Sequence, residues 1–268
     1  MYRGFQLNLD PKKFSDYLAN GEQIHEVLLD GFKEVLDQYA VSDTVLDGSK
    51  MQADWFPQAH GDIFISHAHA DQKLAMGLAG WLYEKFEIIA FIDSCIWGHA
   101  DVLLRNIDDV HCKDPKTGNY NYQRRNRSTA HVHIMVNNAL SKMIDHMECL
   151  FFLDTPKSTV RELVEKKTQS PWIYSELSIS RIIRKRIPER AQITELFKAF
   201  SGGGALNESQ REEVQIQYML ELDHLVKLNT TDLEFWARAF QTKKKLIHVK
   251  EGHPLDTLYE IKPLKKPR

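Results

Sequence analysis

The stretch that decides the fold is "DIFISHAHADQKLAMGLAGWLYEKFEIIAFID", residues 62–93. Its first five residues form a short apolar run typical of a strand, and residues 71–86 carry apolar side chains at helical spacing. Residues 87–93 are almost continuously apolar, as in a strand buried on both faces of a parallel sheet. Strand, helix and strand within about thirty residues make a βαβ unit, whose crossover should be right-handed. This stretch therefore predicts an α/β protein.

The same alternation continues along the chain. The sequence predicts a helix over residues 131–147, a buried strand over 148–155 and a helix over 171–186. Together with the first unit, these elements indicate an open, doubly wound sheet. The intervening residues 108–130 are polar, rich in tyrosine and arginine, and too long for an ordinary α/β connection. We therefore expect a surface insertion there.

The two ends of the chain look different from this central part. Residues 1–60 place apolar side chains at helical intervals and predict a separate helical extension. Residues 187–268 predict a mostly helical C-terminal part that completes the fold, with a last strand at 244–250. The expected α/β domain therefore spans residues 61–186.

Composition excludes several classes of protein. The chain has 268 residues and a formal net charge of −2, which argues against a dedicated nucleic-acid binder. No apolar run approaches the roughly 20 residues of a membrane helix, and the first residues do not form a secretory signal. The three cysteines are Cys95, Cys112 and Cys149, an odd number without C-x-x-C spacing. We expect a cytoplasmic protein with reduced thiols and no membrane or nucleic-acid partner.

The H-x-H-x-D spacing in "SHAHAD" is similar to part of the signature of metallo-β-lactamase-type hydrolases, which hold two metal ions. On extended backbone, His67 and His69 would point the same way, as ligands of one metal should. Those hydrolases need a further histidine after the aspartate, where this chain has Gln72, a poor metal ligand. His131 and His133 are two residues apart on a predicted helix and so face different directions. The sequence therefore favours loop histidines and no metal site.

The stretch "SPWIYSEL", residues 170–177, opens the last predicted helix. Ser170 is a favourable N-cap, and Trp172 and Glu176 lie four residues apart on one face of the helix. Spacing alone leaves two interpretations. Trp172 and Glu176 can be a functional pair, or Trp172 can be a core residue and Glu176 a solvated one paired with Arg181.

Three stretches together resemble the Toll/interleukin receptor (TIR) domain family, and its bacterial branch in particular. They are "DIFISHAHADQKLAMGLAGWL", "AFIDSCIWG" and "SPWIYSEL" after a buried strand, and the resemblance covers roughly residues 62–186. The resemblance implies a flavodoxin-like fold of five parallel strands flanked by helices.

The resemblance also implies an activity and a site. Enzymatic members of the family cleave the nicotinamide–ribose bond of NAD+ with the glutamate of a W-x-x-x-E stretch, which is Glu176 in this chain. The substrate pocket that it implies consists of Ser66, His67, Asp93, Trp97, Gly98 and Trp172, with Trp97 and Gly98 in a loop that closes over the site. NAD+ is the substrate, so no cofactor is expected.

One carboxylate suffices for this chemistry, because the nicotinamide of NAD+ is cationic and leaves as a neutral molecule. An ionised Glu176 would stabilise the positive charge that develops on the ribose. The expected enzyme is an NAD+ glycohydrolase or ADP-ribosyl cyclase that depletes NAD+ or makes an ADP-ribose-derived signal in bacterial antiphage defence of the Thoeris kind. Its expected partners are further copies of itself and an effector that senses the product.

Two further possibilities stay open at the level of the sequence. The family also contains members that act only by self-association, so a non-enzymatic interaction module is the alternative function. In the 108–130 segment, Arg124, Arg125 and Arg127 can either meet a pyrophosphate or form solvated surface.

Overall fold

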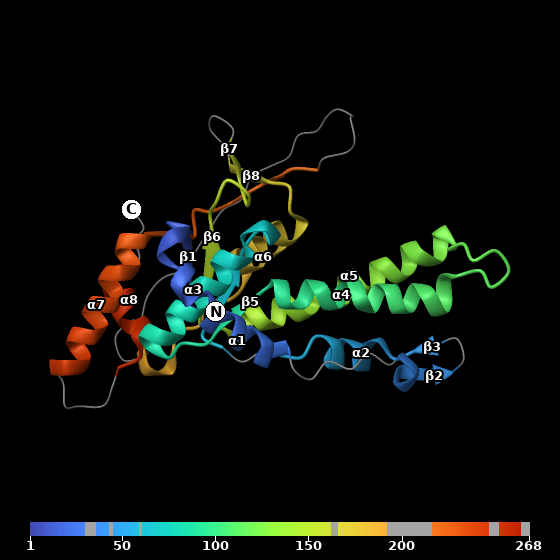
Figure 1. Ribbon diagram of the computed structural model, residues 1–268, viewed down its shortest axis with the longest axis horizontal. Helices are drawn as coiled ribbons and strands as arrows, with labels where there is room; N and C mark the ends of the chain where they lie inside the picture. Colours follow the sequence, from blue (N-terminus) through green and yellow to red (C-terminus); the bar gives the residue numbers. More distant parts are fainter. Residues whose placement is uncertain are drawn as a thin grey trace.

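The centre of the protein is a five-stranded sheet in which all neighbouring strands are parallel (Figure 1). The computed structural model describes residues 1–29, 36–42, 45–58, 61–161, 166–191, 216–246 and 252–263. In sheet order the strands are β10 (Leu225–Asn229), β1 (Arg3–Asn8), β6 (Cys149–Leu153), β4 (Ile63–Ser66) and β5 (Ala90–Ile92). Helices flank the sheet, so the predicted flavodoxin-like α/β architecture is confirmed.

The helices cover both faces of the sheet. They are α1 (Leu18–Leu29), α2 (Gly48–Trp55), α3 (Gln72–Phe86), α4 (Ser94–Ile107), α5 (Tyr122–His146), α6 (Pro171–Ile182), α7 (Thr230–Leu246) and α8 (Pro254–Ile261). The chain moves from β4 to β5 in one direction and returns from β5 to β6 in the other, so right-handed crossovers place α3 and α5 on opposite faces. Helix α1 packs on α3, and α5 packs against α4 and α6. Helix α7 joins α3 through the ring of Trp236, which stacks on Phe86 at 3.9 Å between centroids.

The prediction that residues 1–60 form a separate helical extension was wrong. Strand β1 lies inside the sheet between β6 and β10, and the following segment contains two short strands as well as helices. The six residues "RGFQLN" escaped detection because two polar side chains are buried in them. Arg3 donates to the carbonyl oxygen of Lys262 at 3.0 Å, and Gln6 donates to Asp154 at 2.8 Å. Partners far away in the chain thus satisfy side chains that a local pattern assigns to the surface.

The order of the strands creates a switch point beside β4. Without β1, the remaining strands follow the second–first–third–fourth order of a flavodoxin-like sheet. The chain leaves β4 toward β5 on one side and reaches β6 on the other, so the connections diverge at the carboxyl ends of β4 and β6. Open α/β sheets bind their ligands in the crevice at such a point.

The segment 108–130 is not the polar insertion that the sequence predicted. It contains a π-helical turn, η5 (Asp108–Cys112), and the first turns of α5, so that α4 and α5 form a long helical hairpin that projects from the sheet (Figure 1). The hairpin tip is closed by Asp108, which accepts hydrogen bonds from Arg125 at 2.9 Å and Ser128 at 2.5 Å. The polar side chains that suggested a loop therefore bond the two helices together.

The remaining strands form two small antiparallel sheets. One pairs β2 (Ala40–Ser42) with β3 (Val45–Leu46), and the other contains β7 (Val160–Arg161), β8 (Lys166–Thr168) and β9 (Tyr218–Met219). Strands β8 and β9 contact α6, where the ring of Tyr218 stacks on Tyr174. None of the helices within the described ranges is long and apolar enough to cross a bilayer.

The C-terminal part departs from its prediction in two places. The part predicted to be mostly helical contains β9 and β10 where the structure describes it, and the predicted strand at 244–250 begins inside α7. This part begins with a short 3-10 turn at Glu189–Ala191, and residues 192–215 lie outside the described residues.

Candidate active site

Four of the predicted site residues converge at the carboxyl edge of the sheet. Ser66 ends β4 and His67 follows it, Asp93 directly follows β5, and Glu176 lies on α6. Their exposed fractions are 0% for Ser66, 4% for His67, 2% for Asp93 and 0% for Glu176. The cluster therefore forms at the switch point, from three segments that are far apart in the sequence.

Local sequence explains why Glu176 faces inward. Ser170 caps α6 by accepting a hydrogen bond from the backbone N–H of Ile173 at 3.3 Å, as the sequence predicted. From this start, the buried positions of the helix are Ile173, Glu176, Leu177 and Ser180. These positions follow the spacing of one helix face, so Glu176 occupies a place in the stripe that packs toward the sheet. The interpretation of Glu176 as a solvated residue is wrong.

The four polar side chains form a continuous chain of contacts. The Ser66 hydroxyl donates a hydrogen bond of 2.6 Å to Oε2 of Glu176. Asp93 forms a close ion pair with Nδ1 of His67, and its charge acts on the nearby Glu176 carboxyl group. Asp93 therefore lies between the Ser66–Glu176 hydrogen bond and His67.

Burial and charge shift the protonation of this cluster. Burial, and then the charge of Asp93, raise the pKa of Glu176 well above its ordinary value, and the hydrogen bond from Ser66 opposes the rise. Burial lowers the pKa of His67, but Asp93, together with Asp71 and the backbone of Ile65, raises the pKa of His67 overall. The two shifts favour the neutral form of Glu176 and the charged form of His67.

Several buried polar atoms at this site lack a hydrogen-bond partner. Among the described residues, three such atoms lie here: Nε2 of His67, Oε1 of Glu176 and the hydroxyl of Ser94, the residue after Asp93. Nδ1 of His67 and Oδ1 of Asp93 face each other as an ion pair. Buried polar groups in native proteins are nearly always paired, so this concentration indicates a site built for something other than stability.

Two other predicted site residues, Trp172 and Gly98, are not part of this cluster. Trp172 is half-buried one turn before Glu176 on α6, and its ring meets the ring of His133 edge-on at 5.3 Å. The predicted closing loop is instead the first part of α4, where Gly98 is exposed; Trp97 shares this helix, and its side chain lies outside the described part of the structure.

The histidines of the opening motif separate. His67 is buried with Asp93, whereas His69 is exposed. Within the described ranges, no group of three or more His, Cys, Asp or Glu side chains is placed to hold a metal ion.

A second polar cluster, which the sequence did not predict, lies at the end of β6. Asp154 accepts hydrogen bonds of 2.8 Å from Gln6 and Thr159 and forms an ion pair with Lys166. An aspartate directly after a buried strand was the available signal, but its partner Gln6 lies in the strand that the sequence analysis missed. Because both Asp154 carboxylate oxygens have partners, this cluster fastens β1 and β8 to the sheet edge.

The arginines of the hairpin are far from the candidate site. Arg124 bonds the carbonyl oxygen of His111 and Arg125 pairs with Asp108, both at the hairpin tip. Helix α5 contacts α6 at Asn137, which accepts a 2.5 Å hydrogen bond from Ser175. Arg124 precedes Asn137 by 13 residues, or about 20 Å of helix. A pyrophosphate bound beside Glu176 would not meet these arginines.

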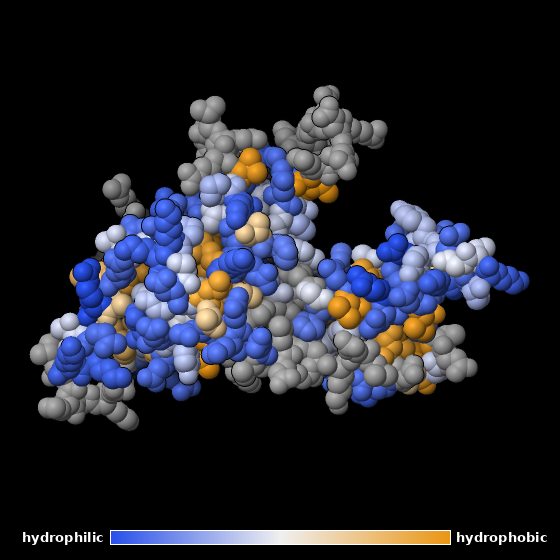
Figure 2. Space-filling view, viewed as in Figure 1, coloured by the Kyte–Doolittle hydropathy of each residue, from blue (hydrophilic) through white to orange (hydrophobic). Residues whose placement is uncertain are grey.

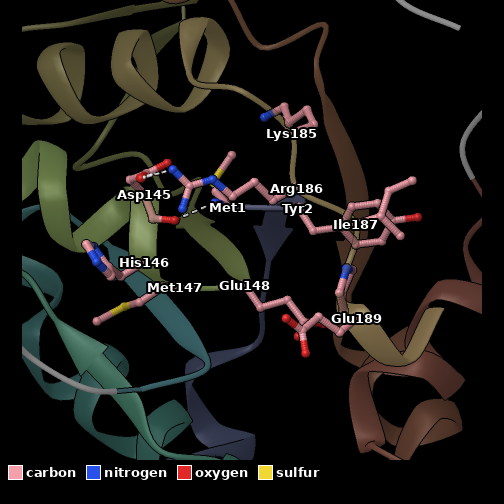
Figure 3. A pocket seen from close by; sticks show the side chains of 11 residues that line it. Met1, Tyr2, Asp145, His146, Met147, Glu148, Lys185, Arg186, Ile187 and Glu189 are labelled. Carbon is pink, nitrogen blue, oxygen red and sulfur yellow. Dashed lines mark hydrogen bonds and ion pairs between the residues drawn. The ribbon is translucent and has the colours of Figure 1, made fainter. Parts of the chain in front are cut away.

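The site is closed in this structure. Glu176 and Ser66 have no exposed surface, so a dinucleotide cannot reach them without movement of the surrounding segments. A pocket of about 770 Å³ lies instead at the opposite, amino edge of the sheet, between the start of β1, the end of α5 and residues 185–189 (Figure 3). No family model matches the chain, and searches of curated proteins and of solved structures found no similar protein.

Proposed function

We propose that this protein is an NAD+-cleaving enzyme of the TIR type, a glycohydrolase or a cyclase. The observation that carries the proposal is the convergence of Ser66, His67, Asp93 and Glu176 at the switch point of a parallel sheet. These four residues are among those that the family resemblance implies for the site. We further propose that the product acts in bacterial defence, where an effector senses it.

The chemistry uses the Glu176 carboxylate as the stabilising charge. The nicotinamide–ribose bond breaks with its electron pair moving to the ring nitrogen, so the ring leaves as neutral nicotinamide. The ribose carbon gains positive charge, which the ionised Glu176 stabilises, and Ser66 holds one carboxylate oxygen in place. Water then adds to the ribose carbon and releases a proton, giving ADP-ribose; an acceptor within the substrate gives a cyclic product.

Substrate entry requires the cover of the site to move. The connection after β6 is fastened to the start of α3, because Asp71 pairs with Lys157 at 3.2 Å and bonds Thr155. On the far side, Tyr218 of β9 stacks on Tyr174 of α6. We propose that release of these contacts lets α6 swing outward and admits the dinucleotide beside Glu176.

The direct test is NAD+ consumption by the purified protein, with chromatography of the products. Glu176→Gln should lower turnover by about 10²–10³-fold, as removal of one preorganised charge-stabilising group does elsewhere. Glu260→Gln is the matched control, because Glu260 is an exposed glutamate that pairs with Lys243 on the surface. Equal turnover in wild type and Glu176→Gln would remove Glu176 from the mechanism, and the chromatogram distinguishes linear from cyclic ADP-ribose.

A specific observation also favours the second candidate, a non-enzymatic module that acts by self-association. Glu176 is fully enclosed, and the α4–α5 hairpin and its tip expose apolar side chains, which include Val102, Val110, Tyr122 and Ile134. Figure 2 shows hydrophobic surface on this projecting part of the molecule. This function predicts that Ile134→Glu abolishes self-association measured by light scattering, and that no condition yields NAD+ turnover.

A further inference from the structure

Asp93 occupies the central position of the candidate site. It directly follows β5, beside the end of β4 that carries Ser66, is 2% exposed and pairs with His67. On one side it faces Nδ1 of His67, and on the other it neighbours the Glu176 carboxyl group. The family resemblance assigned Asp93 only to the substrate pocket, which does not explain why a second carboxyl group is buried against Glu176.

Two neighbouring carboxyl groups need a proton or a cation between them. Ionised carboxylates only accept hydrogen bonds, and two of them in a buried site repel each other. Ser66 satisfies Oε2 of Glu176, but Oε1 has no donor among the described residues. A proton on the Glu176 carboxyl group supplies the missing donor toward Asp93 and removes the repulsion.

Among the described residues, the titratable side chains near the pair each contact another residue. After β4 lie His67, which pairs with Asp93, and Asp71, which pairs with Lys157. From α5, the ring of His133 reaches Trp172 on α6. His67 is therefore the basic side chain that pairs directly with the Asp93 carboxyl group.

We propose that Asp93 is a positioning residue that acts through Glu176: His67 holds the Asp93 carboxylate against the Glu176 carboxyl group, which keeps its proton until a positively charged substrate ring enters the site. The inference rests on the proposed function for the identity of that ring, a nicotinamide riboside. Entry of the ring releases the Glu176 proton to solvent, and the ionised Glu176 then stabilises the ribose cation. After the neutral ring leaves, the proton given up by the attacking water returns to Glu176.

This arrangement selects the substrate by charge. A neutral N-riboside offers no positive charge to replace the proton, so Glu176 stays protonated and cannot stabilise the ribose cation. Positively charged N-ribosides are thus the substrate class that the pair accepts, and Asp93 is the residue that sets this requirement.

The test is the titration of Glu176 in the intact protein, followed by NMR of ¹³C-carboxyl-labelled glutamate between about pH 4 and pH 9. The Glu176 signal is assigned by its loss in Glu176→Gln. Asp93→Asn should lower the midpoint of Glu176 by about one pH unit or more, because it removes a like charge. Ser66→Ala is the opposing control, since loss of its hydrogen bond should raise the midpoint.

Because the two variants should move the midpoint of Glu176 in opposite directions, the test distinguishes the proposed role of Asp93 from general damage to the structure. A variant that merely lets water into the site would lower the midpoint in both cases. An unchanged or raised midpoint in Asp93→Asn overturns the proposal. If that variant does not fold, ¹⁵N NMR of the unmodified protein decides: a charged His67 ring at pH 7 supports the proposal and a neutral ring overturns it.

NAD+ turnover measured on the same samples distinguishes the role of Asp93 from the proposed reaction. If turnover depends on Glu176 but the titration midpoint of Glu176 is unchanged in Asp93→Asn, the proposed role of Asp93 is wrong and the proposed reaction is still supported. If the midpoint of Glu176 changes as expected but the protein never consumes NAD+, the coupling of the two carboxyl groups is supported and the proposed reaction is wrong.

Discussion

The two edges of the central sheet differ in how far their charged side chains are paired and exposed to solvent. At the amino edge, two carboxylates that line the open pocket pair with arginines: Asp145 with Arg186 at 2.6 Å, and Glu148 with Arg190 at 2.5 Å. At the carboxyl edge, Glu176 has no opening to solvent and keeps a buried oxygen without a partner. Carboxylates that are already paired with arginines need no ligand for stability. A buried polar atom without a hydrogen-bond partner costs stability, which indicates that the site serves another purpose. Chemistry is therefore expected at the closed edge.

The carboxyl edge itself is not uniform, and this makes the contrast more specific. Asp154 at the end of β6 is as deeply buried as the site residues, yet both of its carboxylate oxygens have partners. Both clusters thus contain a buried carboxyl group, but only that of Glu176 has an oxygen without a hydrogen-bond partner among the described residues.

The strongest effect that we expect is a difference in NAD+ turnover between variants of two glutamates, one at each edge of the sheet. Glu176→Gln should lower NAD+ turnover by about 10²–10³-fold. Glu148→Gln at the amino edge should leave turnover within about twofold of wild type, because Glu148 acts through its ion pair with Arg190 and not on substrate. Initial rates of NAD+ loss for both variants check this. The reverse result would place the reaction in the open pocket and overturn the contrast between the edges.

The pH dependence of stability is the next strongest effect. The folded pKa of Glu176 is raised above its ordinary value of 4.5, so the folded state binds this proton more tightly than the unfolded state does. The stabilisation is full below pH 4.5 and is lost as pH rises through the folded pKa. The loss amounts to about 1.4 kcal/mol for every pH unit that separates the unfolded from the folded pKa.

Glu176→Gln, which cannot ionise, should therefore show a flatter decline than wild type. Denaturant midpoints between about pH 5 and pH 9 measure the difference. His67 has a raised pKa with the same sign and is present in both proteins, so it cancels in the comparison. Parallel curves for the two proteins would contradict the burial of a neutral Glu176.

The sequence predicted the part of this site that depends on local pattern. The βαβ unit and the capped start of α6 follow from spacing within short windows, which place Ser66 and Asp93 at the ends of strands and Glu176 on α6. The family resemblance, and not the spacing, singled out these three residues. The enclosure of Glu176 could not, because it depends on a hydrogen bond to Ser66, 110 residues away. Strand β1 was missed for the same reason, since its buried Arg3 is satisfied by residues near the other end of the described chain.

A weaker effect concerns the stability of the amino edge. Arg190 joins two elements, because it pairs with Glu148 before β6 and with Asp256 on α8 at 2.9 Å. Its side chain is a third exposed, so loss of both pairs in Arg190→Ala should lower the free energy of unfolding by about 1–2 kcal/mol. Urea denaturation measures this, with Arg181→Ala on α6 as a control that pairs with the more exposed Glu221 and Asp223. Turnover should be unaffected by Arg190→Ala, and a loss of turnover without a loss of stability would give the amino edge a functional role.

The weakest effect gives the amino edge a pH dependence of the opposite sign. Burial lowers the pKa of Lys185 to about 8, from an ordinary value of 10.5. The folded state therefore binds this proton less tightly than the unfolded state, and stability should rise as pH increases from about 8 to 10.5. Because Lys185 is partly exposed and also donates to the carbonyl oxygen of Ser180, the gain should be only about 1 kcal/mol. Lys185→Met should lose the rise in unfolding midpoint above pH 8 while keeping the decline due to Glu176 at lower pH. If Lys185→Met also removed the fall in stability that is attributed to Glu176, the titrations of Lys185 and Glu176 would be coupled. The difference between the two edges would then not arise from these side chains separately.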